Sequence, residues 1–211
     1  IMEERYGENA VYKGVIDSLL DFIRDNIDVD EVDYVSGGER RDWFFSLLAA
    51  KGLGKPHITI YKDLSAVISE NGKTREAGTI NGGRVLHIAD LITEASSYER
   101  AWIPAIKDMS GRMTCSVVIV DRKQGGSELL EKHEVCSFAM VSIDKSFFDK
   151  ALAMGRINCA QHDMLVKYAS DPHGSMKAFL EEHPGFIEKA LRSDERTRER
   201  ARLCIDKGIY R

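Results

Sequence analysis

Three loops of this sequence combine glycines, hydroxyl groups and charges in patterns that suit an anion-binding site. The first reads Ser36-Gly-Gly-Glu-Arg-Arg-Asp42. Glycines let the backbone approach a ligand closely, and the guanidinium groups of Arg40 and Arg41 offer forked donors to phosphate oxygens. The alternative interpretation is a solvated turn in which Asp42 caps the following helix.

The second loop, Ala89-Asp-Leu-Ile-Thr-Glu-Ala-Ser-Ser97, comes directly before a segment with helical spacing. Small hydroxylated residues at a helix start leave backbone N–H groups free to hold a phosphate. Asp90 can bind hydroxyl groups or a hydrated Mg²⁺ ion. The alternative for this loop is ordinary helix capping by Ser96 or Ser97.

The third loop, Asp121-Arg-Lys-Gln-Gly-Gly126, offers Arg122 as a bidentate partner for a planar carboxylate, with a plain surface turn as the alternative. No Ser/His/Asp set, paired-carboxylate site or P-loop stands out. Cys159-Ala-Gln-His162 has metal-ligand spacing, but no second pair completes a tetrahedral site. We therefore expect no metal at Cys159 and His162.

Each of these loops follows an apolar segment that is typical of a buried strand. Strands are predicted at residues 32–35, 58–61, 84–89, 116–121 and 135–143, and helices at 11–27, 43–51, 98–107 and 128–132. Asn71-Gly72 predicts a two-residue hairpin turn. The alternation predicts an α/β fold, a doubly wound, mostly parallel five-stranded sheet. Ligands bind such sheets beyond the carboxyl ends of the strands, where the three loops lie.

The pattern is helical from about Lys145 to the end, with breaks near Pro172 and Pro184. Asp144 and either Ser193 or Asp194 are predicted helix caps. We expect an α/β domain over residues 1–150. A helical C-terminal extension over residues 151–211 is expected to pack on the same domain.

The composition fits a packed globule, since 43% of the 211 residues are hydrophobic. A net charge of −4 argues against a general nucleic-acid binder. No apolar run approaches the roughly 20 residues that a membrane span needs. The cysteines form no C-x-x-C pair, so we expect reduced core thiols in a cytoplasmic protein.

The segment Arg84-Val-Leu-His-Ile-Ala-Asp-Leu-Ile-Thr-Glu-Ala-Ser-Ser97 resembles the signature of the type I phosphoribosyltransferases. That signature is a strand, two acidic and two apolar residues, and a Thr/Gly/Ser phosphate loop. Val117-Val-Ile-Val-Asp-Arg-Lys-Gln-Gly-Gly126 is similar to the Val-Asp-Arg-x-x-Gly-Gly stretch of orotate phosphoribosyltransferases. The order and spacing of the Gly-Gly turn, Tyr61-Lys62 and these two segments agree with that family, from roughly Val32 to Ile143.

The resemblance implies that the chain transfers phosphoribosyl from phosphoribosyl diphosphate to orotate with Mg²⁺, as a cytoplasmic homodimer with no nucleic-acid or membrane partner. Arg122 would meet the orotate carboxylate, and Asp90 would meet the ribose hydroxyls and the metal. Lys73 and Arg75 would be the catalytic cations of a mobile loop. The other residues implied to bind phosphoribosyl diphosphate are Gly37, Gly38, Glu39, Arg40, Tyr61, Lys62, Thr93, Glu94, Ala95, Ser96 and Ser97.

The chain departs from the family pattern at three places. Ala89 replaces the first acid, Glu94 puts a negative charge in the phosphate loop, and the Glu70–Lys73 hairpin replaces the family's Lys-Asp-His-Gly loop. Two alternatives therefore stay open. One is a phosphoribosyltransferase for another base, and the other is a non-catalytic nucleotide-binding or regulatory protein on the same fold.

Overall fold

The computed structural model describes residues 2–206 and residue 208 and divides the chain into two compact units at Ile143/Asp144. The predicted domain boundary at residue 150 instead falls inside helix α6 (Lys145–Ala153). The packing of the C-terminal extension on the first domain stays a prediction.

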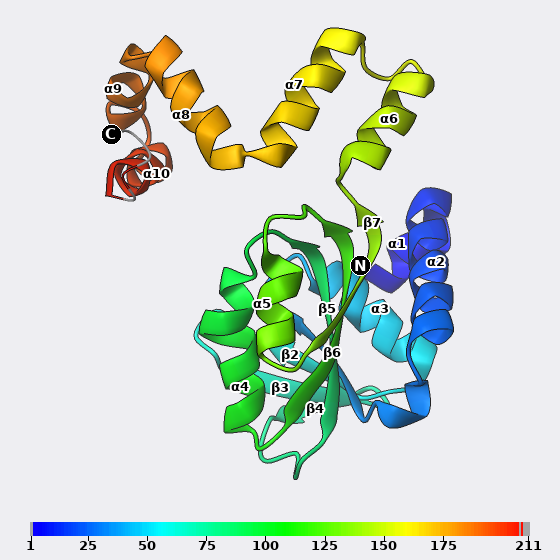
Figure 1. Cartoon of the computed structure of the whole chain (residues 1–211). Coiled ribbons are helices and arrows are strands. Elements are labelled where there is room, and N and C mark those ends of the chain that lie inside the picture. Colours follow the sequence, from blue (N-terminus) through cyan, green and yellow to red (C-terminus); the bar gives the residue numbers. More distant parts are fainter. Residues whose placement is uncertain (1, 207, 209–211) are drawn as a thin grey trace. The chain divides into compact units, whose positions relative to one another are not determined.

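The first unit is a sheet with helices on both faces (Figure 1). Its apolar strands lie between two hydrophobic clusters, one on each face. In chain order its elements are α1 (Met2–Glu8), α2 (Ala10–Asn26), η1 (Val29–Glu31), β1 (Tyr34–Gly38), α3 (Trp43–Leu53), β2 (His57–Ile60), β3 (Ala66–Glu70), β4 (Lys73–Glu76), β5 (Arg84–Ile92), η2 (Tyr98–Trp102), α4 (Ile103–Asp108), β6 (Arg112–Asp121), α5 (Gly126–Lys132) and β7 (Cys136–Ser142).

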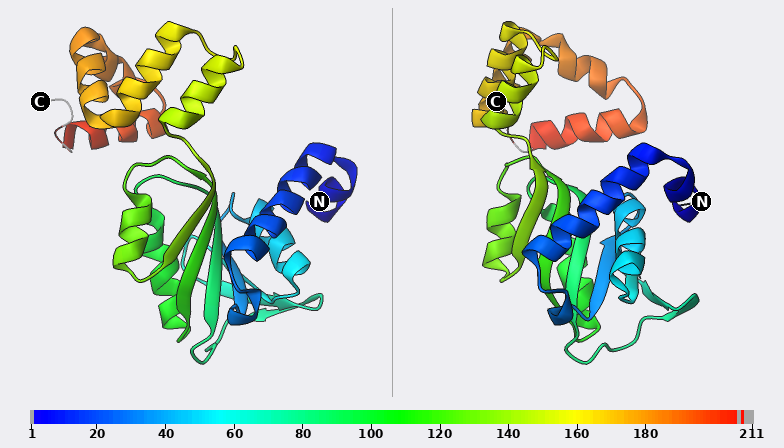
Figure 2. Two further views of the ribbon diagram at one scale, coloured as in Figure 1. Left: turned by 45° about the vertical axis from the view of Figure 1, so that its right-hand side comes forward. Right: turned by 90° about the vertical axis from the view of Figure 1, so that its right-hand side faces the viewer.

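The sheet has the strand order β4-β3-β2-β1-β5-β6-β7, which gives seven strands where five were predicted. The predicted Asn71-Gly72 hairpin accounts for the difference, because β3 and β4 pair antiparallel and β3 continues the sheet beside β2 (Figure 2). Asn71 and Gly72 both adopt positive φ, as a two-residue hairpin turn requires. The other strand pairs are parallel, as predicted.

Helices α2 and α3 lie on one face of the sheet, and η2, α4 and α5 lie on the other (Figure 1). The first face buries Leu19, Ile23 and Leu86, whereas the second buries Ile58, Val118 and Leu130. Strands covered on both faces read as continuous apolar runs, which is why the sequence identified them.

Two strands continue further than predicted, and both changes affect the loops of interest. β1 runs through Gly38 rather than stopping at Val35, because Gly37 and Gly38 pair with Thr59 and Ile60 of β2. β5 runs to Ile92, so Asp90 lies within the strand and not just past it. The last residues of both strands therefore project together at one edge of the sheet.

The second unit consists of α6, α7 (Cys159–Ser170), α8 (Pro172–Glu182), α9 (Gly185–Leu191) and α10 (Glu195–Asp206). The predicted caps Asp144 and Asp194 accept hydrogen bonds from the N–H groups of Phe147 and Thr197. A small core of Leu180, Ile187 and Ala201 joins its last three helices.

All four cysteines are free, but Cys136 and Cys159 are exposed, so the prediction of core thiols was wrong for these two. An edge strand and a helix start leave their side chains in solvent. Within the described chain, no cluster of three metal-binding side chains is found, and no helix is long and apolar enough to span a membrane.

Candidate functional site

The turn after β1 and the end of β5 enclose a pocket of about 200 Å³. Parallel strands bring their carboxyl ends to one edge of the sheet, so residues 48 positions apart meet there. The pocket combines cationic, acidic and hydroxyl side chains over two aromatic rings. Its lining is Glu39, Arg40, Arg41, Asp42, Ala89, Asp90, Leu91, Ile92, Thr93, Glu94, Ala95, Ser96, Ser97, Tyr98 and Trp102.

The loop Thr93–Ser97 forms one side of the pocket between β5 and the helical turn that begins at Ser96. The N–H groups of Glu94 to Ser97 have no hydrogen-bond partner in the described parts of the chain. Ala95 adopts a φ of 54°, and its carbonyl accepts hydrogen bonds from the N–H groups of Tyr98 and Glu99. This geometry leaves several N–H donors available to one anion.

Asp42 joins the two sides of the pocket. Its carboxylate accepts hydrogen bonds from the N–H of Gly38 at 3.1 Å and from the N–H of Asp90 at 3.0 Å. It makes no side-chain cap for α3, so the predicted capping role was wrong. The backbone turns Asp42 toward β5 instead, where it ties the end of β1 to the end of β5.

Asp42 lies on the acidic side of the pocket and is only 7% exposed, so its charged form is poorly solvated. Burial raises the pKa of Asp42 to about 7, and the nearby Asp90 carboxylate adds to this rise. Asp90 itself pairs with Arg41, whose Nε lies 3.0 Å from its Oδ2. Asp90 also accepts a hydrogen bond from the N–H of Leu91.

Buried polar side chains lie behind Asp42. The imidazole Nδ1 of His87 is 2.9 Å from the hydroxyl of Ser36, and its Nε2 is 3.8 Å from Oδ2 of Asp42. That Nε2 has no hydrogen-bond partner in the described residues, and burial lowers the pKa of His87 to about 3. The ring of His57 is hydrogen-bonded to the hydroxyls of Ser46 and Thr59, and burial lowers its pKa to about 3 as well. Both rings are therefore neutral supports for the strand ends.

Two glycines are required by close packing around the pocket. A Cβ at Gly38 would overlap the ring of Trp102, which lines the pocket. A Cβ at Gly126 would lie 2.6 Å from the carbonyl oxygen of Thr93. The glycines of the first and third loops thus position protein side chains and backbone around the pocket.

No protein-family model and no curated protein matches the sequence. Solved structures do match. UMP synthase of Leishmania donovani has a TM-score of 0.62 and 15% identity, with 80% of this chain and 35% of that chain covered. Orotate phosphoribosyltransferase of Aeropyrum pernix has a TM-score of 0.56 and 21% identity, with 75% and 84% covered. Adenine phosphoribosyltransferase of Thermoanaerobacter pseudethanolicus has a TM-score of 0.51 and 15% identity, with 64% and 83% covered.

The chain has the type I phosphoribosyltransferase fold. The fold predicted from the sequence is thereby confirmed. The chain spans about a third of the length of the UMP synthase that it matches.

Within this fold, Tyr61 and Lys62 follow β2 and lie beside the turn after β1. The N–H of Lys62 donates a hydrogen bond to Oε2 of Glu39 at 3.0 Å, and the ring of Tyr61 packs edge-on against Trp43. The Lys62 side chain is exposed. The structure therefore brings two of the predicted diphosphate-binding segments together.

Arg122 follows β6 and is fixed through its backbone, since its N–H donates to the carbonyl of Ile92 at 3.0 Å. The buried Asp121 orders the turn by accepting hydrogen bonds from the N–H of Lys123 and the hydroxyl of Ser127. Arg122 is half-buried and is engaged in a further interaction within the protein. It is not among the residues that line the pocket. Its contact with a base stays a prediction.

Lys73 and Arg75 lie on β4, the edge strand at the far end of the sheet order from β7, and are exposed. They do not line the pocket. Neither side chain is part of the pocket in this structure, so their catalytic role stays a prediction.

The sequence alone did not identify Asp42 or Trp102 as pocket residues. Asp42 looked like a helix cap because it precedes an apolar helical run. Trp102 falls within the predicted helix at residues 98–107 and was given no role. It is 8% exposed, belongs to one core cluster and also lines the pocket. The available signal was topological, since both follow strands whose carboxyl ends meet.

Proposed function

We propose that this chain transfers the phosphoribosyl group of phosphoribosyl diphosphate to orotate, giving orotidine 5′-monophosphate and diphosphate. The observation that carries the proposal is the pocket, where unused N–H donors face a turn with two arginines. The fold shared with orotate and adenine phosphoribosyltransferases supports phosphoribosyl transfer as the reaction. The Val-Asp-Arg-x-x-Gly-Gly resemblance supports orotate as the base.

The proposed binding mode assigns each part of the sugar to one part of the pocket. The 5′-phosphate accepts hydrogen bonds from the N–H groups of Glu94 to Ser97 and from the loop hydroxyls. The ribose hydroxyls reach Asp90. The diphosphate lies toward the turn after β1, where Arg40, Arg41 and Lys62 supply positive charge.

A magnesium ion fits this mode only as a partner of the diphosphate. Mg²⁺ usually keeps several waters and binds one or two carboxylates together with substrate phosphates. Asp90 is a suitable single carboxylate, and the described residues include no group of three metal-binding side chains that would form a protein cage. When bound, the metal would neutralise charge on the leaving diphosphate.

In the proposed reaction the bond between C1 of the ribose and the diphosphate oxygen breaks, and a bond from C1 to a ring nitrogen of orotate forms. The protein contributes by holding both substrates in line. Arg40 and Lys62 stabilise the departing negative charge, with Lys73 and Arg75 as further candidate cations. Arg122 holds the carboxylate of orotate. A homodimer stays an expectation from the resemblance.

Three features of the pocket favour a second candidate, a non-catalytic nucleotide-binding or regulatory protein. Asp90 is already paired with Arg41, Ala89 supplies no second acid, and Glu94 adds negative charge to the pocket. Each of these features weakens sugar-phosphate binding. A transferase for another base, such as adenine, is a further alternative.

The deciding experiment is calorimetric titration with phosphoribosyl diphosphate and Mg²⁺, followed by turnover assays with orotate and with adenine. The proposal expects binding and turnover with orotate. Binding without turnover favours the non-catalytic candidate, and turnover with adenine alone identifies the other base. The absence of any binding defeats all phosphoribosyl functions.

A variant tests the base assignment separately. Arg122→Ala should weaken orotate binding by about 2–3 kcal/mol, the cost of losing a charge-assisted hydrogen-bonded pair. Binding of phosphoribosyl diphosphate should be unchanged. Lys123→Ala is the matched control, because this exposed neighbour in the same turn pairs with Asp121. Equal effects of both variants would contradict the role of Arg122.

A further inference from the structure

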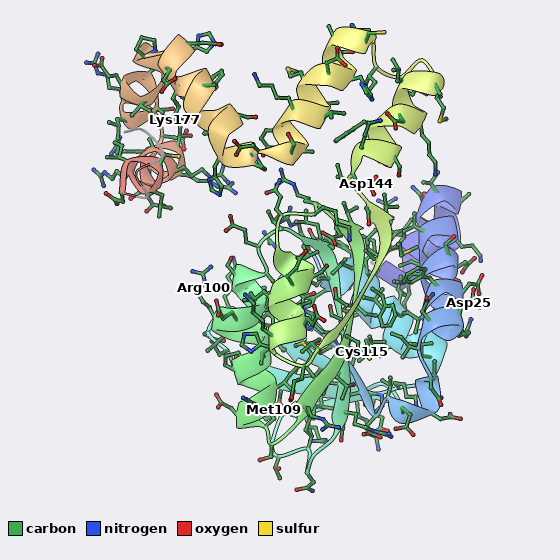
Figure 3. All side chains as sticks on the ribbon, viewed as in Figure 1. Asp25, Arg100, Met109, Cys115, Asp144 and Lys177 are labelled. Atoms are coloured by element: carbon green, nitrogen blue, oxygen red, sulfur yellow. The ribbon has the colours of Figure 1, made fainter. Side chains whose placement is uncertain are left out.

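Outside the pocket, two thiols lie side by side on neighbouring strands. Cys115 of β6 and Cys136 at the start of β7 are paired in register in a parallel ladder. Figure 3 labels Cys115 on β6. Residues paired in register on parallel strands point to the same face of a sheet. The packing agrees, because Cys115 and Phe138, two residues after Cys136, contact the same hydrophobic cluster.

The spacing of the pair suits a disulfide. Neighbouring strands lie about 4.7–4.9 Å apart, and disulfides usually join Cα atoms about 4.4–6.8 Å apart. The Cβ atoms need a small further approach. β7 can supply it, because it is an edge strand with β6 as its one neighbour in the described sheet.

A small oxidant can reach the pair from solvent. Cys136 is exposed and Cys115 is half-buried, and both line a groove of about 340 Å³. The exposed Arg112 lines the same groove and has no ion-pair partner in the described parts of the chain. The groove also carries Asp28, Glu31 and Arg84, so its charges are of both signs, and the reaction rests on solvent access to the two thiols.

The two thiols differ in reactivity. Burial raises the pKa of the Cys115 thiol, and the neighbouring Cys136 thiol raises it further. The thiolate is the reactive form. Cys136, which is accessible, is therefore the sulfur that reacts first, and Cys115 is the one that reacts second.

We propose that Cys115 and Cys136 form a reversible dithiol–disulfide pair that is oxidised by a small disulfide such as oxidised glutathione. The Cys136 thiolate attacks one glutathione sulfur, the glutathione disulfide breaks, and one glutathione thiolate leaves. Cys115 then loses its proton to solvent and attacks the Cys136 sulfur, releasing the second glutathione thiolate. Two protein thiols lose two electrons, and one glutathione disulfide gains them.

The test uses the full chain carrying Cys159→Ser and Cys204→Ser, two changes in the helical unit. This protein is incubated with oxidised glutathione, and its intact mass, thiol content and cysteine-containing peptides are measured. The expected result is the loss of two hydrogens, no remaining free thiol, and a peptide linking Cys115 to Cys136. Dithiothreitol should restore both thiols.

A variant that also carries Cys115→Ser is the matched control, and it should keep one glutathione on Cys136. The unsubstituted chain, mapped in the same way, covers the case in which a serine variant folds poorly. A lasting glutathione adduct on Cys136 in the two-thiol protein would overturn the proposal. A link between two copies, or no reaction, would overturn it equally.

Discussion

The two sides of the pocket differ in how their hydrogen-bonding groups are used. In the loop Thr93–Ser97, the N–H groups of Glu94 to Ser97 have no partner in the described residues. On the opposite side, Asp42 accepts two backbone hydrogen bonds, and Asp90 is held by Arg41 and by the N–H of Leu91. One side is open to a ligand, whereas the other is occupied by internal partners.

This difference separates what is structural from what is available for binding. An anion can enter the loop without displacing any protein contact, so the loop is preorganised. A ligand that needs Asp90 must compete with Arg41, which is largely exposed. Asp90 is only 19% exposed, so the pair is open to solvent on its arginine side alone, and ion pairs at a surface contribute about 0–1 kcal/mol. The pair can therefore open at low cost, while the buried contacts of Asp42 cannot.

The largest expected effect comes from Asp42→Ala. It leaves two N–H groups at the strand ends without acceptors, and each costs about 1–3 kcal/mol when buried. We expect the free energy of unfolding to fall by about 2–5 kcal/mol in urea denaturation at about pH 4, where Asp42 is protonated in the folded chain and its contribution is nearly complete. Asp63→Ala is the control, since this exposed carboxylate accepts only local bonds from Ser65. A loss below about 0.5 kcal/mol would show that Asp42 does not join the two sides.

Gly38→Ala should have the next largest effect, because its Cβ would overlap the ring of Trp102. Overpacking of this kind costs about 1–3 kcal/mol. The matched control is Gly78→Ala, where a Cβ would meet no heavy atom within 4 Å. Similar unfolding curves for the two variants would mean that the ring of Trp102 moves aside at little cost in free energy.

The pH dependence of stability tests the burial of Asp42. Its folded-state pKa is raised to about 7, against about 3.9 in an unfolded chain. Its contribution to stability is therefore complete below about pH 3.9 and is lost as the pH rises through about 7. Relative to Asp42→Asn, which does not titrate, the native protein should lose stability steadily over this range.

The pKa shifts of the two buried imidazoles change stability in the opposite direction. The pKa values of His57 and His87 are lowered to about 3, so their contribution to stability grows as the pH rises from about 3 to about 6.5. The native protein and the Asp42→Asn variant both contain these histidines, so the difference between their free energies of unfolding reports on Asp42 alone. A difference that stays constant from pH 4 to pH 8 would contradict its raised pKa.

The sequence predicted the fold well where hydrophobic patterning decides the structure. Strands covered on both faces produced apolar runs such as Val117–Val120, and Asn71-Gly72 identified a hairpin. What the patterning could not show is that this hairpin joins the sheet. Strand pairing beyond a local turn depends on tertiary contacts, here those of β3 with β2.

The candidate site was predicted in part. Local residue types identified the loop Thr93–Ser97, because small residues before a helix leave N–H groups free. Asp42 was misread because capping is a local rule, and its actual partner, the N–H of Asp90, lies 48 residues away. The ion pair between Arg41 and Asp90 could not be predicted either, because it forms only where the ends of β1 and β5 lie side by side.

A smaller effect is expected from Glu94→Gln, which removes a charge from the open side of the pocket. Glu94 is exposed, so solvent and salt screen its repulsion of a bound phosphate. We expect phosphoribosyl diphosphate with Mg²⁺ to bind about 2–5-fold tighter, equivalent to roughly 0.4–1 kcal/mol. Glu99→Gln, an exposed carboxylate in the following helical turn, serves as the control in the same titration. Weaker binding would instead indicate that Glu94 contacts the metal or the ligand.

The smallest effect on stability is expected from Arg41→Gln. The Arg41 side chain is 73% exposed and that of Asp90 is 19% exposed, so solvent screens the pair from one side and breaking it should lower the free energy of unfolding by less than about 1 kcal/mol. Arg40→Gln, at the adjacent exposed arginine, is the control in parallel urea titrations. A loss above about 2 kcal/mol for Arg41→Gln alone would mean that Arg41 supports the pocket as Asp42 does. The acidic side would then be a fixed structural wall, because a ligand could reach Asp90 only by breaking a contact that the fold requires.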